Sequence, residues 1–338
     1  MFKEAVLWKE LEEKGALCCL CAHRCIIPPE GYGKCGMRKN IDGILFTFAY
    51  GKVIAEHVDP IEKKPLYHFL PGSNTYSIAT LGCNLKCSFC QNWSISQVRA
   101  IEKDDIDGKE MSPAEIVRKA KETFCYNISY TYTEPTVFFE YAYDIAKIAH
   151  ENGIKNSFIT NGFMTKEALE AISPYLDAAN VDLKFFKDST YKKMCEGSLG
   201  PVLETIRRMK EAGIWIEVTT LIIPGENDSD EELRDIARFL AGIDVNIPWH
   251  LSRFHPNYKE KKIAFTPSES IKKAMAIGKK EGLLYVYPGN TEFSADTVCP
   301  GCGRTLIERQ GFHSSVTGHF DERGQCKMCE IRISGVWE

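Results

Sequence analysis

TYSIATLGCNLKCSFCQN, residues 75–92, joins an apolar run that is typical of a β-strand to a loop with three closely spaced cysteines. Cys83, Cys87 and Cys90 follow the spacing C-x3-C-x2-C. Three thiolates on one short loop can ligate three irons of a cubane 4Fe-4S cluster and leave the fourth iron without a protein ligand. A small molecule can bind and react at that open iron. The alternative is a zinc knuckle that takes its fourth ligand from a distant part of the chain.

The cysteine loop resembles that of the radical S-adenosylmethionine (SAM) superfamily, and an aromatic residue, Phe89, stands just before its last cysteine. The resemblance implies that Cys83, Cys87 and Cys90 are the catalytic ligands of a 4Fe-4S cluster. It also implies that SAM chelates the open iron and is cleaved reductively to a 5'-deoxyadenosyl radical.

Size, charge and cysteine content bound the remaining classes of protein. The 338 residues fit one domain of about 200 to 250 residues with smaller appendages. A net charge of -4 gives no basic field that would attract nucleic acid, so nucleic acid is not favoured as a partner. No apolar run approaches the roughly 18 residues of a membrane span, and we expect a cytoplasmic protein without membrane association. Twelve of the fourteen cysteines form three tight groups, which in a reducing compartment indicates metal binding rather than disulfides.

The first cysteine group lies near the N-terminus and can bind a metal. Cys19 and His23 are spare candidates for a ligand, and unligated buried thiols are the alternative. Zinc and a second iron–sulfur cluster both suit the main set of ligands, which is Cys18, Cys21, Cys25 and Cys35. Around this group we expect a helix at residues 4–13, a hairpin at residues 44–58 and an ordered connector at residues 59–72.

From residue 75 onward, β-branched or aromatic runs alternate with helical patterns, which indicates repeated βα units and a parallel sheet. Strands are expected at residues 75–80, 127–132, 156–160, 179–183, 215–222 and 249–252, and a further strand at residues 283–287. Helices are expected to begin near Pro113, Thr136, Thr165, Leu199, Asp228 and Pro267. Six such units predict an α/β fold, the partial (β/α)6 barrel that radical SAM enzymes use.

The composition changes after residue 290 and marks a C-terminal unit. Two C-x2-C turns that face each other make a tetrahedral S4 site, so we predict a zinc ribbon, with ferric iron as the alternative. The ligands are Cys299, Cys302, Cys326 and Cys329. The chain is therefore expected to divide into a cysteine-rich segment (1–74), a radical SAM partial barrel (75–290) and a zinc-ribbon-like domain (291–338).

Polar residues follow the expected strands, and in parallel barrels functional side chains lie at the C-terminal ends of strands. The second strand leads into Tyr132-Thr133-Glu134-Pro135, in the place of the superfamily's Gly-Gly-Glu-Pro element. The resemblance implies that Glu134 and the backbone near Tyr132 receive the amino group of SAM. The alternative is a glutamate that only starts the next helix.

The third and fourth strands lead into a TNG element (Thr160 and Asn161) and a D-x-K element (Asp182 and Lys184). Both resemble elements of glycyl-radical activating enzymes, where they line the carboxylate and ribose of SAM beside a cation site. Asp182 and Lys184 share one face of a strand, and an ion pair at the barrel mouth is the alternative. Ile159 stands where those enzymes usually carry Asp, which weakens the case for the cation site.

The sixth strand carries His250, and the same resemblance places this histidine against SAM. Without the resemblance, a histidine at a strand end is a structural hydrogen-bonding residue. Cys125 and Cys195 lie outside the three cysteine groups, and we expect no catalytic role for either.

The flanking motifs extend the resemblance over most of the chain. With DPIEKKPLYHFLPGS and the CPGCG turn, the sequence looks like the radical SAM member of the AmmeMemoRadiSam system, often labelled pyruvate formate-lyase activating enzyme-like. The resemblance implies AMMECR1-domain and Memo-type partners, a low-potential electron donor such as ferredoxin or flavodoxin, and a protein or peptide substrate. The alternatives are a radical SAM methylase, an RNA-modifying enzyme and a non-catalytic metal-binding scaffold.

Overall fold

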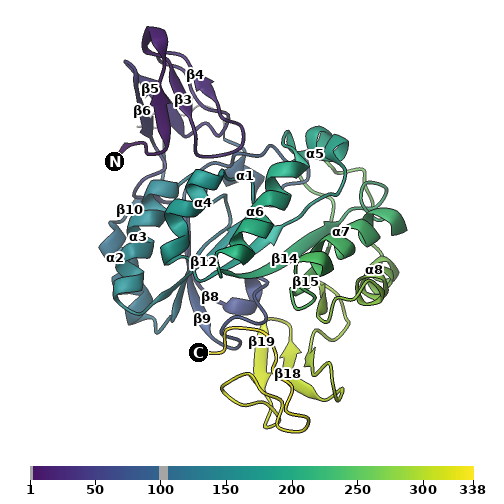
Figure 1. The fold of residues 1–338 in the computed structure, drawn as a ribbon. Coiled ribbons are helices and arrows are strands. Elements are labelled where there is room, and N and C mark those ends of the chain that lie inside the picture. The colour runs from purple at the N-terminus through teal and green to yellow at the C-terminus, as the bar shows by residue number, and fades with distance from the viewer. Residues whose placement is uncertain (1–2, 99–105) are drawn as a thin grey trace.

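An eight-stranded sheet forms the centre of the computed structural model, which describes residues 3–98 and 106–338 (Figure 1). Neighbouring strands in this sheet are β16 (Val286–Gly289), β15 (Trp249–Arg253), β14 (Trp215–Ile222), β13 (Ala178–Asp182), β12 (Lys155–Thr160), β11 (Asn127–Tyr130), β9 (Asn74–Ala79) and β8 (Ala55–Pro60). All neighbours pair in parallel except β8, which runs antiparallel along β9. The predicted α/β fold is confirmed, and the strand expected at 283–287 joins the sheet as β16.

Helices connect the parallel strands and cover the sheet (Figure 1). They are α1 (Trp93–Ser96), α2 (Pro113–Glu122), α3 (Phe139–Glu151), α4 (Lys166–Ile172), α5 (Asp188–Cys195), α6 (Leu199–Glu211), α7 (Asp230–Ile243) and α8 (Ser268–Lys280). Capping residues fix several starts: Ser112 forms a capping box with Glu115, and Thr165 and Ser229 accept hydrogen bonds from backbone amides of the first turn. None of the helices in the described ranges has the length and apolar character of a membrane span.

Helix α5 has no counterpart among the helices expected from the sequence. Its eight residues, DSTYKKMC, carry only three buried side chains, Tyr191, Met194 and Cys195. An apolar pattern of three residues is too short to distinguish a helix from a loop in the sequence. Cys195 is the last residue of this helix.

The N-terminal segment forms two small sheets rather than the predicted helix at residues 4–13. One sheet contains β1 (Lys3–Glu4), β6 (Ile44–Thr47) and β5 (Arg38–Ile41); the other contains β2 (Trp8–Glu10), β3 (Ala16–Cys18) and β4 (Ile26–Ile27). The helix prediction was wrong because these strands pair with residues far along the chain: Lys3 lies opposite Thr47, and Trp8 opposite Cys18. Leu7 between the strands has a φ of +55°, which no α-helix accommodates.

The hairpin expected at residues 44–58 was also wrong. Strand β6 pairs with β1 and β5, whereas β7 (Lys52–Val53) pairs with β10 (Lys109–Glu110) and β8 joins the central sheet. The turn at Tyr50-Gly51 therefore connects strands of different sheets. Its apolar flanks are buried against different partners, so the sequence pattern alone resembled a hairpin.

A three-stranded C-terminal ribbon, residues 291–338, lies at the opposite end of the molecule from the N-terminal sheets (Figure 1). Its strands are β17 (Thr297–Val298), β18 (Thr305–Gln310) and β19 (His313–Val316). Arg309 of the ribbon donates a hydrogen bond of 2.7 Å to the carbonyl of Tyr67, and His68 contacts the Ser334 carbonyl at 2.8 Å. The connector at residues 59–72 thus anchors the ribbon to the barrel; η2 (Ile61–Lys63) is its helical turn.

Candidate active site

The three cysteines of residues 83–90 line one cavity at the carboxyl ends of the parallel strands. This central cavity has a volume of about 480 Å³ and is walled by Cys83, Cys87 and Cys90 together with residues from several strand ends. Burial raises the pKa of Cys83 well above its usual value, and the pKa of Cys87 is raised first by a hydrogen bond with Cys195 and then by burial. Free thiols here hold their protons, so binding of a metal releases them.

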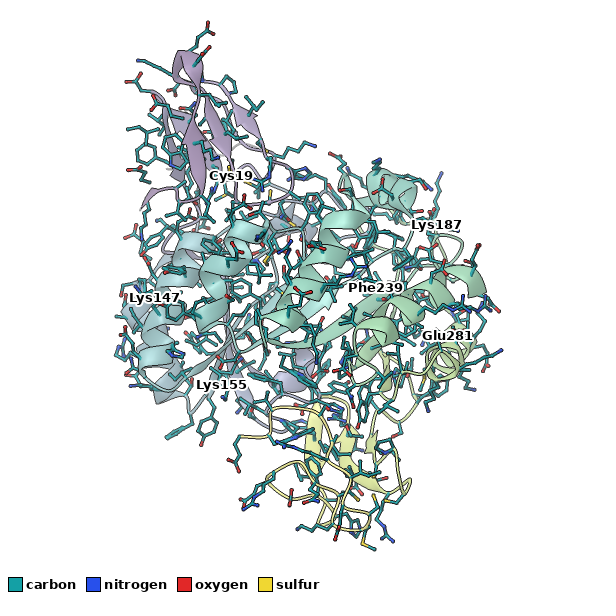
Figure 2. All side chains as sticks on the ribbon, viewed as in Figure 1. Cys19, Lys147, Lys155, Lys187, Phe239 and Glu281 are labelled. Carbon is teal, nitrogen blue, oxygen red and sulfur yellow. The ribbon has the colours of Figure 1, made fainter. Side chains whose placement is uncertain are left out.

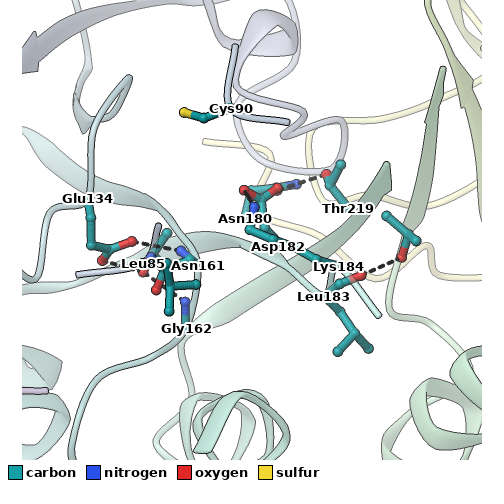
Figure 3. Close-up of polar contacts among 12 residues, drawn as sticks. Leu85, Cys90, Glu134, Asn161, Gly162, Asn180, Asp182, Leu183, Lys184 and Thr219 are labelled. Atoms are coloured by element: carbon teal, nitrogen blue, oxygen red, sulfur yellow. Dashed lines mark hydrogen bonds and ion pairs between the residues drawn. The ribbon is translucent and has the colours of Figure 1, made fainter. Parts of the chain in front are cut away.

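The donor set of the central cavity fits a cluster with one open position. Among the described residues that line this cavity, the only cysteines are Cys83, Cys87 and Cys90. Cys195 is fully buried beside Cys87 and does not line the cavity. In Figure 3, Cys90 lies on one side of the site and Glu134, Asn161 and Asp182 lie on the other. Three thiolates facing polar side chains suit a 4Fe-4S cluster whose fourth iron takes a small molecule.

Glu134 is the most heavily hydrogen-bonded carboxylate on the wall of the central cavity. Its Oε1 accepts hydrogen bonds from the Thr160 hydroxyl at 2.7 Å, from the Thr136 hydroxyl at 2.6 Å and from the Thr136 amide at 3.0 Å. Its Oε2 accepts one from the Asn161 amide at 2.8 Å (Figure 3). Burial raises the pKa of Glu134, and these donors oppose the rise. The carboxylate is thus held rigidly at the ends of β11 and β12.

Tyr132 takes a backbone conformation that glycine usually provides. Its φ of +64° lies in the left-handed region, which is strained for a bulky side chain. The side chain compensates, because its hydroxyl donates a hydrogen bond to Asp59 and its ring lies 4.4 Å from the Lys64 ammonium. The carbonyl of Tyr132 accepts a hydrogen bond from Asn92 at 2.8 Å. Tyr132 thus holds a left-handed backbone conformation at the start of the Thr133-Glu134-Pro135 turn.

Asn161, Asp182, Lys184 and Phe89 also line the central cavity, whereas Thr160 lies behind it. The Asn161 amide lies 3.6 Å from the Cys83 sulfur. Lys184 and Asp182 form an ion pair of 2.8 Å, the alternative that the sequence left open. Burial works to lower the pKa of Lys184, but the negative charges of Asp182 and the nearby cysteines raise it well above its usual value.

His250, for which the resemblance implies a contact with SAM, lies in an internal hydrogen-bond network. It is buried outside the lining of the central cavity, and its Nε2 contacts the Glu217 carboxylate at 2.6 Å. Its ring stacks on Tyr287 at 5.4 Å. Glu217 also accepts hydrogen bonds from the backbone amides of the connector at residues 67 and 68. Glu217 thus holds the imidazole of His250 in this internal network, and the contact of His250 with SAM stays a prediction.

Two lysines of the connector, Lys63 and Lys64, line the central cavity and were not predicted as site residues. Both pair with Asp59, at 2.8 Å and 2.7 Å. Burial lowers the pKa of Lys64 to about 8, although Asp59 opposes the change. The sequence signal was a pair of adjacent lysines between two prolines, a composition that is equally typical of an exposed turn.

The C-terminal ribbon contains a compact metal-binding group. The sulfurs of Cys299, Cys302, Cys326 and Cys329 all lie within 4.8 Å of one another. Four cysteines at this spacing fit one tetrahedral ion. The N-terminal set lies elsewhere, around a smaller cavity below the N-terminal sheets, which is lined by Cys18, Cys21, Cys25 and Cys35.

Comparisons with known proteins agree with this geometry. The model of the Radical SAM superfamily matches residues 77–240, which include the cysteine loop and the strand ends around the central cavity. An uncharacterized protein of Methanocaldococcus jannaschii, MJ0808, is 44% identical over 99% of both chains. GTP 3',8-cyclase of Aquifex aeolicus is 30% identical over 49% of this chain and 52% of its own. Pyruvate formate-lyase-activating enzyme of Clostridium pasteurianum is 24% identical over 48% of this chain and 67% of its own.

The matched region contains the three-cysteine loop and most of the parallel strands that form the central cavity. A 4Fe-4S cluster and SAM follow from the family, and the residues of the central cavity fit both. The chain belongs to the radical SAM superfamily.

Proposed function

We propose that this protein cleaves SAM reductively and abstracts hydrogen from a protein or peptide. When bound, the cluster and SAM supply the chemistry, which is the transfer of one electron to the sulfonium and the formation of a 5'-deoxyadenosyl radical. The observation that carries the proposal is the convergence of three cysteines and Glu134 on one cavity of about 480 Å³. The chain's own task is to position SAM and to exclude water.

Each group on the wall of the central cavity has a proposed role. Cys83, Cys87 and Cys90 hold the cluster. Glu134, fixed by Thr136, Thr160 and Asn161, receives the amino group of SAM together with the carbonyls of the Tyr132 loop. The Asp182–Lys184 pair faces the polar part of SAM, and Phe89 packs against its adenosine.

Similarity to an activating enzyme supports a macromolecular substrate. The relative from Clostridium pasteurianum carries the name pyruvate formate-lyase-activating enzyme. The negative net charge of the chain also disfavours RNA. We therefore propose a peptide backbone or side chain as the source of the abstracted hydrogen, and a ferredoxin or flavodoxin as the electron donor.

The wider setting is also a proposal. The resemblance to the AmmeMemoRadiSam system favours AMMECR1-domain and Memo-type proteins as partners or substrates, in a cytoplasmic setting. We assign zinc to the C-terminal cysteines, because a closed set of four thiolates at tetrahedral spacing suits it.

The reaction class is tested by anaerobic reconstitution and measurement of 5'-deoxyadenosine from SAM with a chemical reductant. The wild type should form it, and Cys87→Ala should form none, whereas Cys125→Ala should match the wild type because Cys125 is buried away from the central cavity. A wild type with a spectroscopically verified cluster and no 5'-deoxyadenosine would contradict the proposal. SAM binding would then be absent as well if the protein were a metal-binding scaffold.

A second candidate is chemistry on a nucleotide, RNA or a methyl acceptor. It is favoured by Lys63 and Lys64 on the cavity wall and by the similarity to GTP 3',8-cyclase. Product analysis separates the two: deuterium incorporated into 5'-deoxyadenosine from labelled peptide supports the first, and deuterium from labelled nucleotide supports the second.

A further inference from the structure

The N-terminal cysteines converge from separate turns of the N-terminal sheets. Cys18 ends β3, Cys21 and Cys25 lie in the turn before β4, and Cys35 lies before β5. All four line one cavity. Cys19 points elsewhere, with its sulfur 3.7 Å from the Leu17 carbonyl. Figure 2 places Cys19 at the junction between the N-terminal sheets and the helical body, so the neighbouring ligands lie at an internal boundary of the molecule.

The spacing of these sulfurs differs from that of the C-terminal set in the same chain. The C-terminal sulfurs lie within 4.8 Å of one another, and two pairs are 3.4 Å and 3.7 Å apart. Those values fit a single ion, because Zn–S bonds of about 2.3 Å set tetrahedral sulfurs about 3.8 Å apart. Over residues 3–98 and 106–338, no other three His, Cys, Asp or Glu residues meet this limit. The N-terminal thiols therefore surround their cavity more widely than one zinc ion requires.

Wider spacing of the sulfurs is what a cubane cluster requires. In such a cluster each thiolate binds a different iron, so its sulfurs lie farther apart than those around a single ion, as the N-terminal sulfurs do.

A buried cation stands beside this cavity. Arg38 is 1% exposed, and its Nη1 donates a hydrogen bond of 3.3 Å to the Cys18 sulfur. Its Nη2 pairs with Glu140, which is also buried. A donor to a ligating sulfur stabilises the reduced, more negative state of an iron–sulfur cluster and raises its potential.

The N-terminal cavity and the central cavity are lined by neighbouring residues of one loop. Asn84, the neighbour of Cys83, lines the N-terminal cavity. Its carbonyl contacts the His23 imidazole at 2.7 Å, and its side chain accepts a hydrogen bond from Asn161 at 2.8 Å. At Gly82 an added Cβ would lie 2.5 Å from a side-chain carbon of Met37 and 3.3 Å from the Cys35 carbonyl. The two cysteine loops are therefore closely packed at Gly82.

We propose that Cys18, Cys21, Cys25 and Cys35 hold a second, fully ligated 4Fe-4S cluster that delivers electrons to the Cys83 site. An electron donor of the ferredoxin or flavodoxin class is oxidised as this cluster gains one electron. This cluster is reoxidised when the electron passes by way of Asn84 to the cluster at the Cys83 site. The relay rests on the proposed function, whereas the presence of the cluster does not.

Metal content tests the presence of the cluster. A full-length variant with Cys83, Cys87 and Cys90 all changed to Ala, purified anaerobically, should keep about four irons and about four sulfides, with a 4Fe-4S Mössbauer spectrum. Adding Cys21→Ala should remove them, and adding Cys19→Ala, the matched control, should not. A triple variant with no iron and about two zinc ions would overturn the proposal. If the triple variant fails to fold, the wild type decides: about eight irons support the proposal and about four contradict it.

The relay has a separate readout. In the otherwise wild-type protein, Cys21→Ala should lower 5'-deoxyadenosine formation at least tenfold with reduced flavodoxin as donor, and less than twofold with a small chemical reductant. An equal loss with both donors, or none with either, would overturn the relay. A wild type that cleaves no SAM would refute the proposed function, and the iron count of the triple variant would still decide the cluster.

Discussion

Glu134 shows how much of the site depends on a single ionised side chain. Four hydrogen bonds from Thr136, Thr160 and Asn161 converge on its two oxygens. An amide in its place has one oxygen and directs an NH2 group at donors, so the local network cannot be kept. Hydrogen bonds to charged groups contribute about 1.5 to 3 kcal/mol each.

We therefore expect Glu134→Gln to weaken SAM binding at least about tenfold. Equilibrium dialysis of SAM against anaerobically reconstituted protein measures this. Glu167→Gln is the control, because Glu167 is exposed, pairs with Arg24 and does not line the central cavity. Unchanged affinity in Glu134→Gln would show that this carboxylate does not receive SAM.

The position of a site residue was predictable from the sequence where a motif defines its chemistry. It was not predictable where contacts between distant parts of the chain determine its surroundings. The cysteine loop, Glu134 and the D-x-K element could be placed at strand ends from sequence. The contact between His250 and Glu217 could not, because Glu217 lies on the adjacent strand, 33 residues earlier in the chain. Lys64 was missed for the same reason: its neighbours Asp59 and Tyr132 meet only after β8 pairs along β9.

Helix α2 has the strongest local start signal in the chain. The Ser112 hydroxyl accepts a hydrogen bond from the Glu115 amide, and Glu115 accepts one from the Ser112 amide. Ser112→Ala should cost about 1 kcal/mol of stability and lower the melting temperature by about 2 to 4 °C. Differential scanning calorimetry checks this, with Glu151→Ala at the exposed end of α3 as the control. A shift no larger than that of the control would show that α2 does not limit unfolding.

Elements with local signals were predictable, and elements held by distant pairing were not. The parallel strands carry apolar runs between capped helices, and the structure has strands in all these places. The N-terminal strands are only two to four residues long. Strands of this length are too short to show the alternation of apolar and polar residues that marks a β-strand. They exist because residues far apart in sequence pair, as Lys3 does with Thr47.

At the scale of the whole molecule, His68 joins the connector to the C-terminal ribbon. Its Nδ1 donates to the Ser334 carbonyl at 2.8 Å, and its Nε2 accepts from the Tyr287 hydroxyl at 2.6 Å. These partners fix the neutral ring. Burial lowers the pKa of His68 to about 4, although the charge of Glu217 opposes the change, compared with about 6.5 in an unfolded chain.

Stability should therefore fall as the pH decreases from about 6.5 towards 4. In this window the unfolded chain binds a proton that the folded chain does not, and between pH 7 and pH 5 the loss is about 2 kcal/mol. Urea unfolding followed by tryptophan fluorescence measures it, since the Trp337 ring lies 5.4 Å from His68. His68→Gln should flatten this part of the pH profile. An equally steep profile in that variant would assign the effect to other groups.

The mixed lining of the N-terminal cavity has a consequence for how the protein matures. The N-terminal cavity is lined by Cys18 and Cys35 from the small sheets and by Asn84 and Thr136 from the barrel. During synthesis the four N-terminal cysteines leave the ribosome well before Thr136. The cysteine side of the N-terminal cavity is therefore made before the barrel residues that cover it. The proposed N-terminal cluster would then be loaded before the barrel closes the cavity.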